Sequence, residues 1–183
     1  MSAMTVMPRE KRDWTVADLE QLPDDGLRYE LIDGALVVSP APALLHQRAV
    51  VEFLVLLRRA CPPELETFVA PVDFQPDVRN SVQPDVLVIP RPAATAKNVT
   101  SPPLLAIEVL SPSSRSRDFM LKRSLYEDVG VGSYWIFDPT VPQLWAWDLV
   151  DSGYIEAAGA TGAQQVEMRR PFPVTVCPDW LVT

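Results

Sequence analysis

The pattern of apolar and polar positions along the chain predicts a sheet protein with few helices. Nearly continuous aliphatic or aromatic runs occupy residues 86–89, 104–110 and 134–137, and the second run is interrupted by one acid. Such runs are typical of central strands that are buried on both faces. Apolar residues recur at helical spacing over residues 43–60 and 113–129, and we expect a helix in each segment. The apolar side of the second helix includes Leu121, Leu125 and Val129.

Turn-forming residues divide the rest of the chain into short segments. The chain has nineteen prolines and seven glycines, a balance that suits strands better than a helical bundle. Residues 28–32 and 35–39 flank Asp33 and Gly34, and this arrangement predicts a hairpin. Further strands are expected at 68–74, 144–150 and 154–158, and Thr15 with Asp18 predicts the start of a short helix. The expected class is α+β or α/β, with a mixed sheet and helices packed on it.

Length, charge and hydropathy limit the class of protein. The 183 residues fit one domain, of which we expect residues 1–12 to form a flexible arm. No apolar segment is long enough to span a membrane and the first residues do not resemble a secretion signal, so we expect a soluble, cytoplasmic protein without a membrane partner. The net charge of −8 counts against a protein that coats nucleic acid, although it leaves room for an enzyme with a local basic patch.

Two acidic residues stand where the pattern predicts burial. Asp85 begins one aliphatic strand and Glu108 lies within the next. Removing a carboxylate from water costs several kcal/mol, so each acid must be paired or neutralised. Acids on adjacent strands indicate a shared cation, and Mg²⁺ prefers oxygen ligands. In the alternative interpretation Asp85 caps its strand and Glu108 pairs with an arginine, and from the acids alone the two interpretations carry about equal weight.

A basic, hydroxyl-rich segment follows Glu108. Residues 111–123 contain four positive side chains and one negative one, a local charge of +3. A segment of this kind that leads into a helix is suited to phosphate binding. In the alternative, the segment is a solvated helix start in which Asp118 pairs with Lys122 and the serines cap the helix. The candidate substrate-binding residues are Ser111, Ser113, Arg115 and Arg117.

Several motifs occur together in a specific order. They are Arg28-Tyr-Glu-Leu-Ile-Asp-Gly34, Pro84-Asp-Val-Leu-Val88, Ile107-Glu-Val-Leu-Ser-Pro-Ser113, Lys122 with Tyr126, and Gly130-Val-Gly-Ser-Tyr-Trp135 followed by Asp138-Pro139. In order and spacing they resemble the Uma-two restriction endonuclease family of the PD-(D/E)XK nuclease-like superfamily. The resemblance covers nearly the whole chain. It implies a restriction-endonuclease-like fold, with a mixed central sheet flanked by helices.

The resemblance also implies a metal centre. It assigns Asp85 and Glu108 as ligands of Mg²⁺, with Mn²⁺ as a substitute, and offers the backbone carbonyl of Val109 as a third ligand. The superfamily motif has a lysine two residues after the second acid, where this chain has Leu110. The resemblance implies that Lys122, in the following helix, takes over that role and reaches back toward the metal.

Glu30 and His46 complete the set of candidates. Glu30 matches the early acid of the family and would orient a water or help to hold a second ion, or it pairs with Arg28 as an ordinary strand residue. His46 is the only histidine in the chain. It is either an accessory group of the site or a structural hydrogen-bonding residue, and the structural use is the commoner one.

These candidates predict a metal-dependent endonuclease that hydrolyses phosphodiester bonds of DNA, with Asp85, Glu108, Lys122 and Glu30 as its catalytic residues. The alternative is a nuclease-like module with weak or no catalysis that binds nucleic acid or another protein. Leu110 and the acidic net charge motivate this alternative. By analogy with nucleases that pair to cut two strands, we expect a homodimer.

Overall fold

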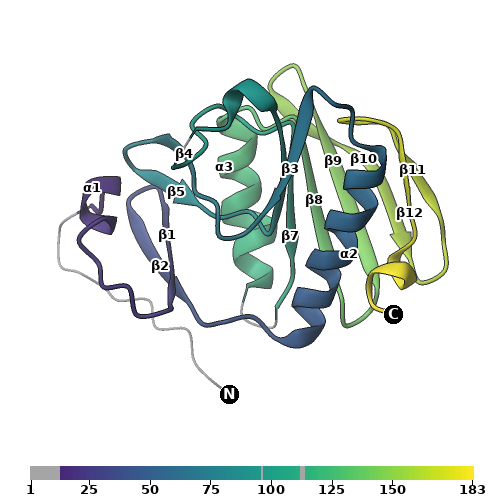
Figure 1. Ribbon diagram of the computed structural model, residues 1–183, viewed down its shortest axis with the longest axis horizontal. Coiled ribbons are helices and arrows are strands. Elements are labelled where there is room, and N and C mark those ends of the chain that lie inside the picture. Colours follow the sequence, from purple (N-terminus) through teal and green to yellow (C-terminus); the bar gives the residue numbers. More distant parts are fainter. Residues whose placement is uncertain (1–12, 96, 112–113) are drawn as a thin grey trace.

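Three β-sheets and the helices packed on them form the part of the chain that the computed structural model describes, residues 13–95, 97–111 and 114–183 (Figure 1). The expected arm, residues 1–12, lies outside this part. The largest sheet has six strands in the order β10-β9-β8-β7-β6-β3, and a second sheet has four in the order β2-β1-β5-β4. Strands β11 and β12 pair with each other. The architecture confirms the predicted class.

The bounds of the elements are as follows. The six-stranded sheet contains β3 (Leu65–Val69), β6 (Val86–Pro90), β7 (Leu105–Val109), β8 (Ser133–Asp138), β9 (Gln143–Val150) and β10 (Gly153–Thr161). The remaining strands are β1 (Arg28–Ile32), β2 (Ala35–Ser39), β4 (Phe74–Asp77), β5 (Asn80–Val82), β11 (Val166–Met168) and β12 (Val174–Val176). The helices are α1 (Val16–Leu19), α2 (Leu44–Ala60), α3 (Arg123–Asp128), the π-helix η2 (Arg117–Lys122), and the 3₁₀-helices η1 (Arg91–Ala93) and η3 (Pro178–Leu181).

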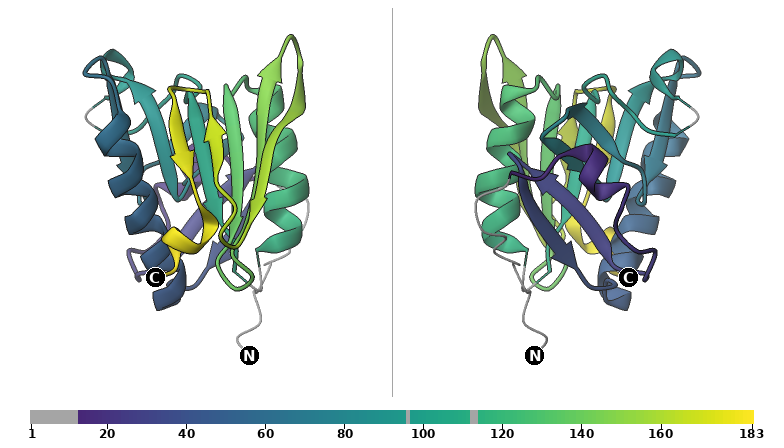
Figure 2. Two further views of the ribbon diagram at one scale, coloured as in Figure 1. Left: turned by 90° about the vertical axis from the view of Figure 1, so that its right-hand side faces the viewer. Right: turned by 90° about the vertical axis from the view of Figure 1, so that its left-hand side faces the viewer.

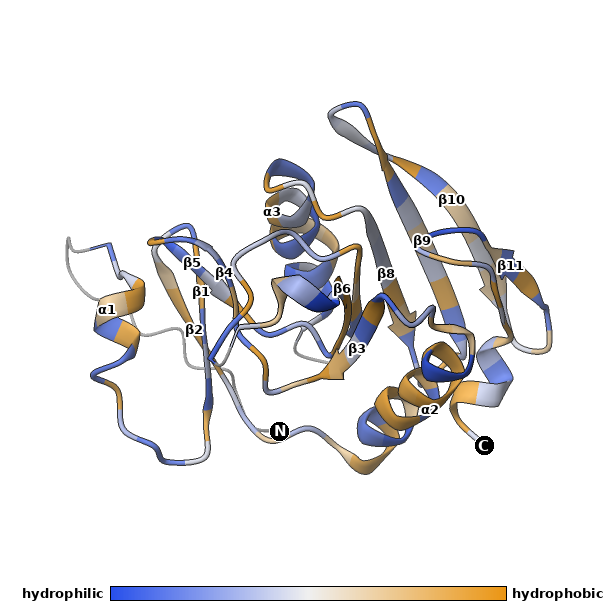
Figure 3. Ribbon diagram, turned by 45° about the horizontal axis from the view of Figure 1, so that its top comes forward, coloured by the Kyte–Doolittle hydropathy of each residue, from blue (hydrophilic) through white to orange (hydrophobic). Residues whose placement is uncertain are grey.

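Both faces of the six-stranded sheet are covered (Figure 2). Helix α2 packs on one face, where Phe53 lies against Trp135 and Phe137. The buried residues of α2 recur on one side of the helix, which carries both hydrophobic and hydrophilic residues (Figure 3). Helix α3 and the four-stranded sheet cover the opposite face. Because residues that alternate along β6, β7 and β8 enter both cores, these strands contain the nearly continuous apolar runs seen in the sequence.

The connection from β7 to β8 determines where the candidate residues lie. These two strands are parallel, whereas the other paired strands of the sheet are antiparallel. A parallel pair requires a crossover, and η2 and α3 provide it. The crossover therefore brings the basic segment back over the strand that carries Glu108.

Two local predictions were wrong. Residues 68–74 do not form one strand, because β3 ends at Val69 and Pro71, which lacks an amide hydrogen, cannot continue the ladder. The predicted helix of residues 113–129 forms as η2 and α3, but its predicted apolar side is wrong at one position. Leu121, predicted to be on the apolar side, is 54% exposed, whereas Lys122 is fully buried.

The hairpin at Asp33 and Gly34 is confirmed. Both residues have positive φ, 47° and 76°, as the two central residues of a type I′ turn require. The turn joins β1 and β2, and β1 in turn pairs with β5. Glu30 lies in the middle of β1 and is fully buried. None of the described helices has both the length and the hydrophobicity that crossing a bilayer requires.

Candidate functional site

Lys122 joins two buried acids that come from different sheets. Its Nζ lies 2.8 Å from Oε1 of Glu108 on β7 and 2.8 Å from Oε1 of Glu30 on β1. Tyr126 lies four residues further along the helix, on the same side, and its hydroxyl donates to the same Oε1 of Glu108 at 2.8 Å. The structure therefore brings together three predicted residues that lie far apart in the sequence.

Asp85 lies at the start of β6 and is held by three groups. Its Oδ1 accepts a hydrogen bond from Nη1 of Arg28 at 3.0 Å. Its Oδ2 accepts one from the backbone N–H of Val109 at 2.8 Å, and Nε2 of His46 lies 3.2 Å from the same oxygen. Arg28 also donates to Oε1 of Glu30 at 3.1 Å. The guanidinium thereby connects Asp85 to the network around Lys122.

The backbone next to the acids contributes to the same network. The N–H of Gln83 donates to Oε1 of Glu30 at 2.9 Å, and the carbonyl of Gln83 accepts a hydrogen bond from Arg28. The other oxygen of Glu30, Oε2, is buried and has no hydrogen-bond partner among the described residues. The same holds for Nδ1 of His46. Buried polar atoms are normally satisfied, so these two atoms are exceptions at this position.

Three buried carboxylates face two permanent cations here. Burial disfavours the charge of Glu30, but Lys122 and Arg28 outweigh it and lower the pKa of Glu30 to about 2. Burial likewise opposes the ionisation of Asp85, and its contacts with His46 and Arg28 hold the pKa of Asp85 below the ordinary value. Burial raises the pKa of Glu108 to about 8, despite the charge of Lys122. Of the three carboxyl groups, Glu108 is therefore the one whose charged form the surroundings stabilise least.

A fourth acid belongs to the same buried region. Asp118 on η2 is 1% exposed, and burial raises its pKa above the ordinary value despite the charge of Lys122. Its Oδ1 lies 3.4 Å from Nε of Arg117, and its backbone carbonyl accepts a hydrogen bond from the hydroxyl of Tyr134 at 2.9 Å. The solvated pair of Asp118 and Lys122, considered as an alternative, is not what the structure has, because both residues are buried.

The basic segment does not form a cradle of free side chains. Nη1 of Arg115 lies 2.6 Å from Oδ2 of Asp138, and its guanidinium lies 5.4 Å from the ring centroid of Phe119. Arg117 contacts Asp118 and donates to Oγ of Ser39 at 3.3 Å. The N–H of Ser111 donates to the hydroxyl of Ser114 at 3.0 Å, and Ser113 lies outside the described residues. Substrate binding by Ser111, Ser113, Arg115 and Arg117 therefore stays a prediction.

The donor chemistry of the site suits a hard divalent cation. Asp85 and Glu108 offer carboxylate oxygens, and the hydrogen bond from Val109 places the end of β7 beside Asp85. A bound cation would favour the ionised form of Glu108, which burial otherwise disfavours. Within residues 13–95, 97–111 and 114–183, no three His, Cys, Asp or Glu side chains form a ready-made ligand set.

Sequence reasoning identified the acids but missed some of their partners. Arg28 was considered only as a partner of Glu30, and its bond to Asp85 spans 57 positions. Tyr126 was part of a motif without an assigned role. Its spacing of four residues from Lys122 could have placed it on the same helix side. Asp118 gave no distinguishing signal, because an acid near a helix start is usually exposed.

Comparison with known proteins adds independent findings. The model of the Uma2 family, described as "Putative restriction endonuclease", matches residues 16–180. A crystal structure of "a putative nuclease belonging to DUF820" from Anabaena variabilis ATCC 29413 superposes with a TM-score of 0.70. It shares 17% sequence identity, and the match covers 91% of this chain and 98% of that one. Among curated proteins, no match was found. At this identity the structural likeness supports the fold alone.

Proposed function

This chain belongs to the Uma2 family, described as "Putative restriction endonuclease", and from that premise we propose that it is a divalent-metal-dependent endonuclease acting on DNA. The observation that carries the proposal is the convergence of Asp85, Glu108 and Lys122, together with Glu30, in one buried network. Buried acids that are only partly neutralised are more typical of functional sites than of structural ion pairs. The family description supports the nuclease class.

Each residue of the network has a role in this proposal. Asp85 and Glu108 would hold the cation, Mg²⁺ or Mn²⁺, which supplies positive charge to polarise a phosphoryl oxygen. The ammonium of Lys122 stabilises negative charge that develops on the phosphate. Glu30 keeps that ammonium in place through its 2.8 Å contact. Tyr126 fixes the orientation of the Glu108 carboxylate by donating to Oε1.

Arg28 has a positioning role. It binds Asp85 with one terminal nitrogen and Glu30 with the other, so the two acids keep a fixed relative position. The contact between His46 and Asp85 is consistent with either use of the histidine considered from the sequence.

Incubation with supercoiled plasmid DNA and Mg²⁺ or Mn²⁺ tests the proposal. We expect the unmodified protein to nick or cleave the plasmid, and Asp85→Ala to lose activity by roughly 100-fold or more, because the site loses one of its two carboxylate ligands. The matched control is Asp24→Ala, which removes an exposed acid and should leave activity unchanged. Circular dichroism checks that both variants fold. Equal cleavage by Asp85→Ala and the unmodified protein would exclude the proposed site.

A nuclease-like module without efficient catalysis is the second candidate. It is favoured by the buried Leu110 at the position of the superfamily lysine, and by the cations that already contact the acids. Calorimetric titration with Mn²⁺ separates the two candidates. Binding that is lost in Glu108→Ala supports the nuclease, whereas the absence of binding supports the module.

A further inference from the structure

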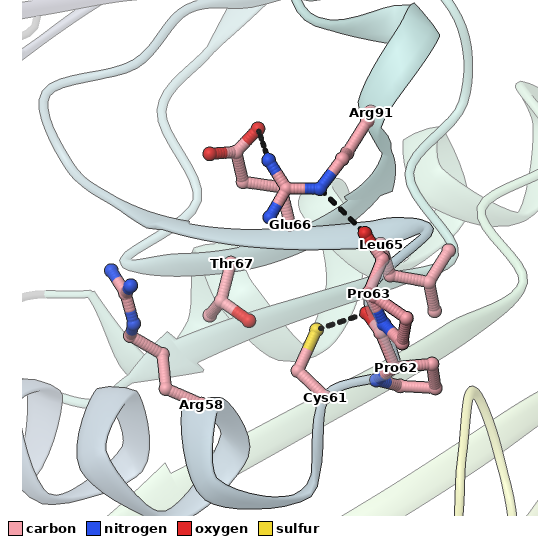
Figure 4. A pocket seen from close by; sticks show the side chains of 8 residues that line it. All are labelled: Arg58, Cys61, Pro62, Pro63, Leu65, Glu66, Thr67 and Arg91. Carbon is pink, nitrogen blue, oxygen red and sulfur yellow. Dashed lines mark hydrogen bonds and ion pairs between the residues drawn. The ribbon is translucent and has the colours of Figure 1, made fainter.

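A polar cavity lies between the end of α2, strand β3 and helix η1 (Figure 4). Its volume is about 100 Å³. Arg58 and Cys61 line it from the end of α2, Thr67 from β3, and Arg91 from η1. Because Cys61 and Thr67 are side chains that can donate hydrogen bonds and the arginines are positively charged, the lining suits an anion.

Thr67 is the unusual residue in this cavity. It is 6% exposed, and its hydroxyl is buried without a hydrogen-bond partner among the described residues. It lies opposite Val88 of β6, in a strand position where a valine would pack without burying an unpaired hydroxyl. A buried hydroxyl that is left unsatisfied costs stability and calls for a specific explanation. A ligand in the cavity would provide the missing partner.

The charges around the cavity favour an anionic ligand. Arg58 makes no ion pair within the part of the chain that the structure describes. Nε of Arg91 donates to the carbonyl of Pro63 at 2.6 Å, and its Nη1 lies 3.6 Å from Oε2 of Glu66, which is long for an ion pair. The lining thus contains two arginines and one acid, a local charge of +1 in a chain of net charge −8.

The size of the cavity limits the ligand. It is smaller than a cavity of about 150 Å³ that holds benzene, so it leaves no room for a nucleobase. A tetrahedral oxyanion is small enough, and guanidinium groups bind phosphate oxygens through paired hydrogen bonds. We propose that this cavity binds a single phosphate group, with Arg58 and Arg91 as charged donors and Thr67 as a neutral donor.

The phosphate group could belong to a free anion, to the end of a nucleic acid or to its backbone. The cavity is separate from the candidate active site, because Asp85 precedes β6 whereas Leu65 pairs with Pro90 at its other end. Thr67, opposite Val88, is three strand residues or roughly 10 Å along β6 from Asp85, and Leu65 is five residues or roughly 16 Å. A nucleic-acid strand held here would thus be anchored at a distance from the acids. That source of phosphate rests on the proposed function, whereas the pocket itself does not.

Titration of the metal-free protein with inorganic phosphate, followed by calorimetry at constant ionic strength, tests the proposal. We expect Arg58→Gln to weaken phosphate binding about tenfold or more, because a charged donor is lost. The matched control is Arg59→Gln, which removes the same charge from the neighbouring exposed residue outside the cavity lining and should change the affinity less than about twofold.

Thr67→Val provides a second, independent variant. It should weaken phosphate binding and at the same time raise the melting temperature of the phosphate-free protein, because it removes an unsatisfied hydroxyl without opening a cavity. A structural role of the hydroxyl would lower the melting temperature instead. Alkylation of Cys61, followed by mass spectrometry, gives a further readout, since phosphate should slow the reaction at this thiol relative to a chloride control.

Oligonucleotides with and without a 5′-phosphate identify the source. If Arg58→Gln weakens binding only of the phosphorylated strand, the pocket binds a terminal phosphate; if it weakens both, the pocket binds the backbone. The proposal is overturned if phosphate does not bind, if Arg58→Gln and Arg59→Gln weaken binding equally, or if phosphate neither shifts the melting temperature nor protects Cys61. If the unmodified protein binds phosphate but does not cleave plasmid DNA, the proposed function alone is overturned.

Discussion

Replacement of Lys122 by methionine is expected to destabilise the protein by about 3–5 kcal/mol at neutral pH. The ammonium is fully buried and lies 2.8 Å from oxygens of both Glu30 and Glu108. Methionine has a similar length but no charge, so the buried carboxylate of Glu30 would lose a cation and Glu108 would lose a hydrogen-bond donor. Urea unfolding followed by circular dichroism measures the change. Lys122→Met should therefore lose stability as well as cleavage activity.

Two further variants show whether charge is the cause. Lys97→Met removes an exposed ion pair with Glu20, at 2.6 Å, and should leave the free energy of unfolding nearly unchanged. The double variant Glu30→Gln/Lys122→Met also removes the charge of Glu30, which Lys122→Met leaves without this cation. It should therefore recover part of the lost free energy of unfolding. If Lys122→Met is as stable as Lys97→Met, the ammonium does not neutralise the acids and the described network is wrong.

The large elements could be predicted because the local pattern of apolar and polar residues indicates which segments are buried. Residues 86–89 and 134–137 are apolar on both sides of the strand, and they form parts of β6 and β8. The residues that were predicted wrongly are those whose burial depends on tertiary structure. Leu121 was assigned to the apolar side from helical periodicity, but its neighbour Lys122 is the buried residue, because Glu108 and Glu30 provide partners for its charge inside the protein.

The candidate site was predictable only in part. Asp85 and Glu108 stand out because an acid next to or within an aliphatic run is anomalous. Their contacts were not predicted, because Arg28 was considered only as a partner of Glu30 and His46 stood out only as the single histidine. Only the pairing of β1 with β5 and the packing of α2 bring these two residues to Asp85. Thr67 is a similar case, since threonine in a strand gives no sign that its hydroxyl lacks a partner.

Glu108→Gln should make the metal-free protein more stable above pH 8 while abolishing cleavage. Burial raises the pKa of Glu108 in the folded state from 4.5 to about 8, so the unfolded chain loses this proton first as the pH rises. The protonated carboxyl group of Glu108 therefore contributes its full stabilisation of the folded state below pH 4.5. This stabilisation, on the order of a few kcal/mol, is lost as the pH rises toward 8. Glutamine keeps an oxygen for Lys122 and Tyr126 but cannot ionise, so the loss does not occur.

Glu30→Gln is the matched control, with the opposite expected sign. Lys122 and Arg28 overcome burial and lower the pKa of Glu30 to about 2, so its charge stabilises the fold above pH 4.5 and this stabilisation is lost as the pH falls toward 2. Glu30→Gln should therefore destabilise the protein at neutral pH. Urea unfolding of both variants between pH 5 and 9 in the presence of a chelator measures the difference. If Glu108→Gln is less stable than the unmodified protein at pH 9, Glu108 is an ordinary ion-pair partner of Lys122, and burial does not raise the pKa of Glu108.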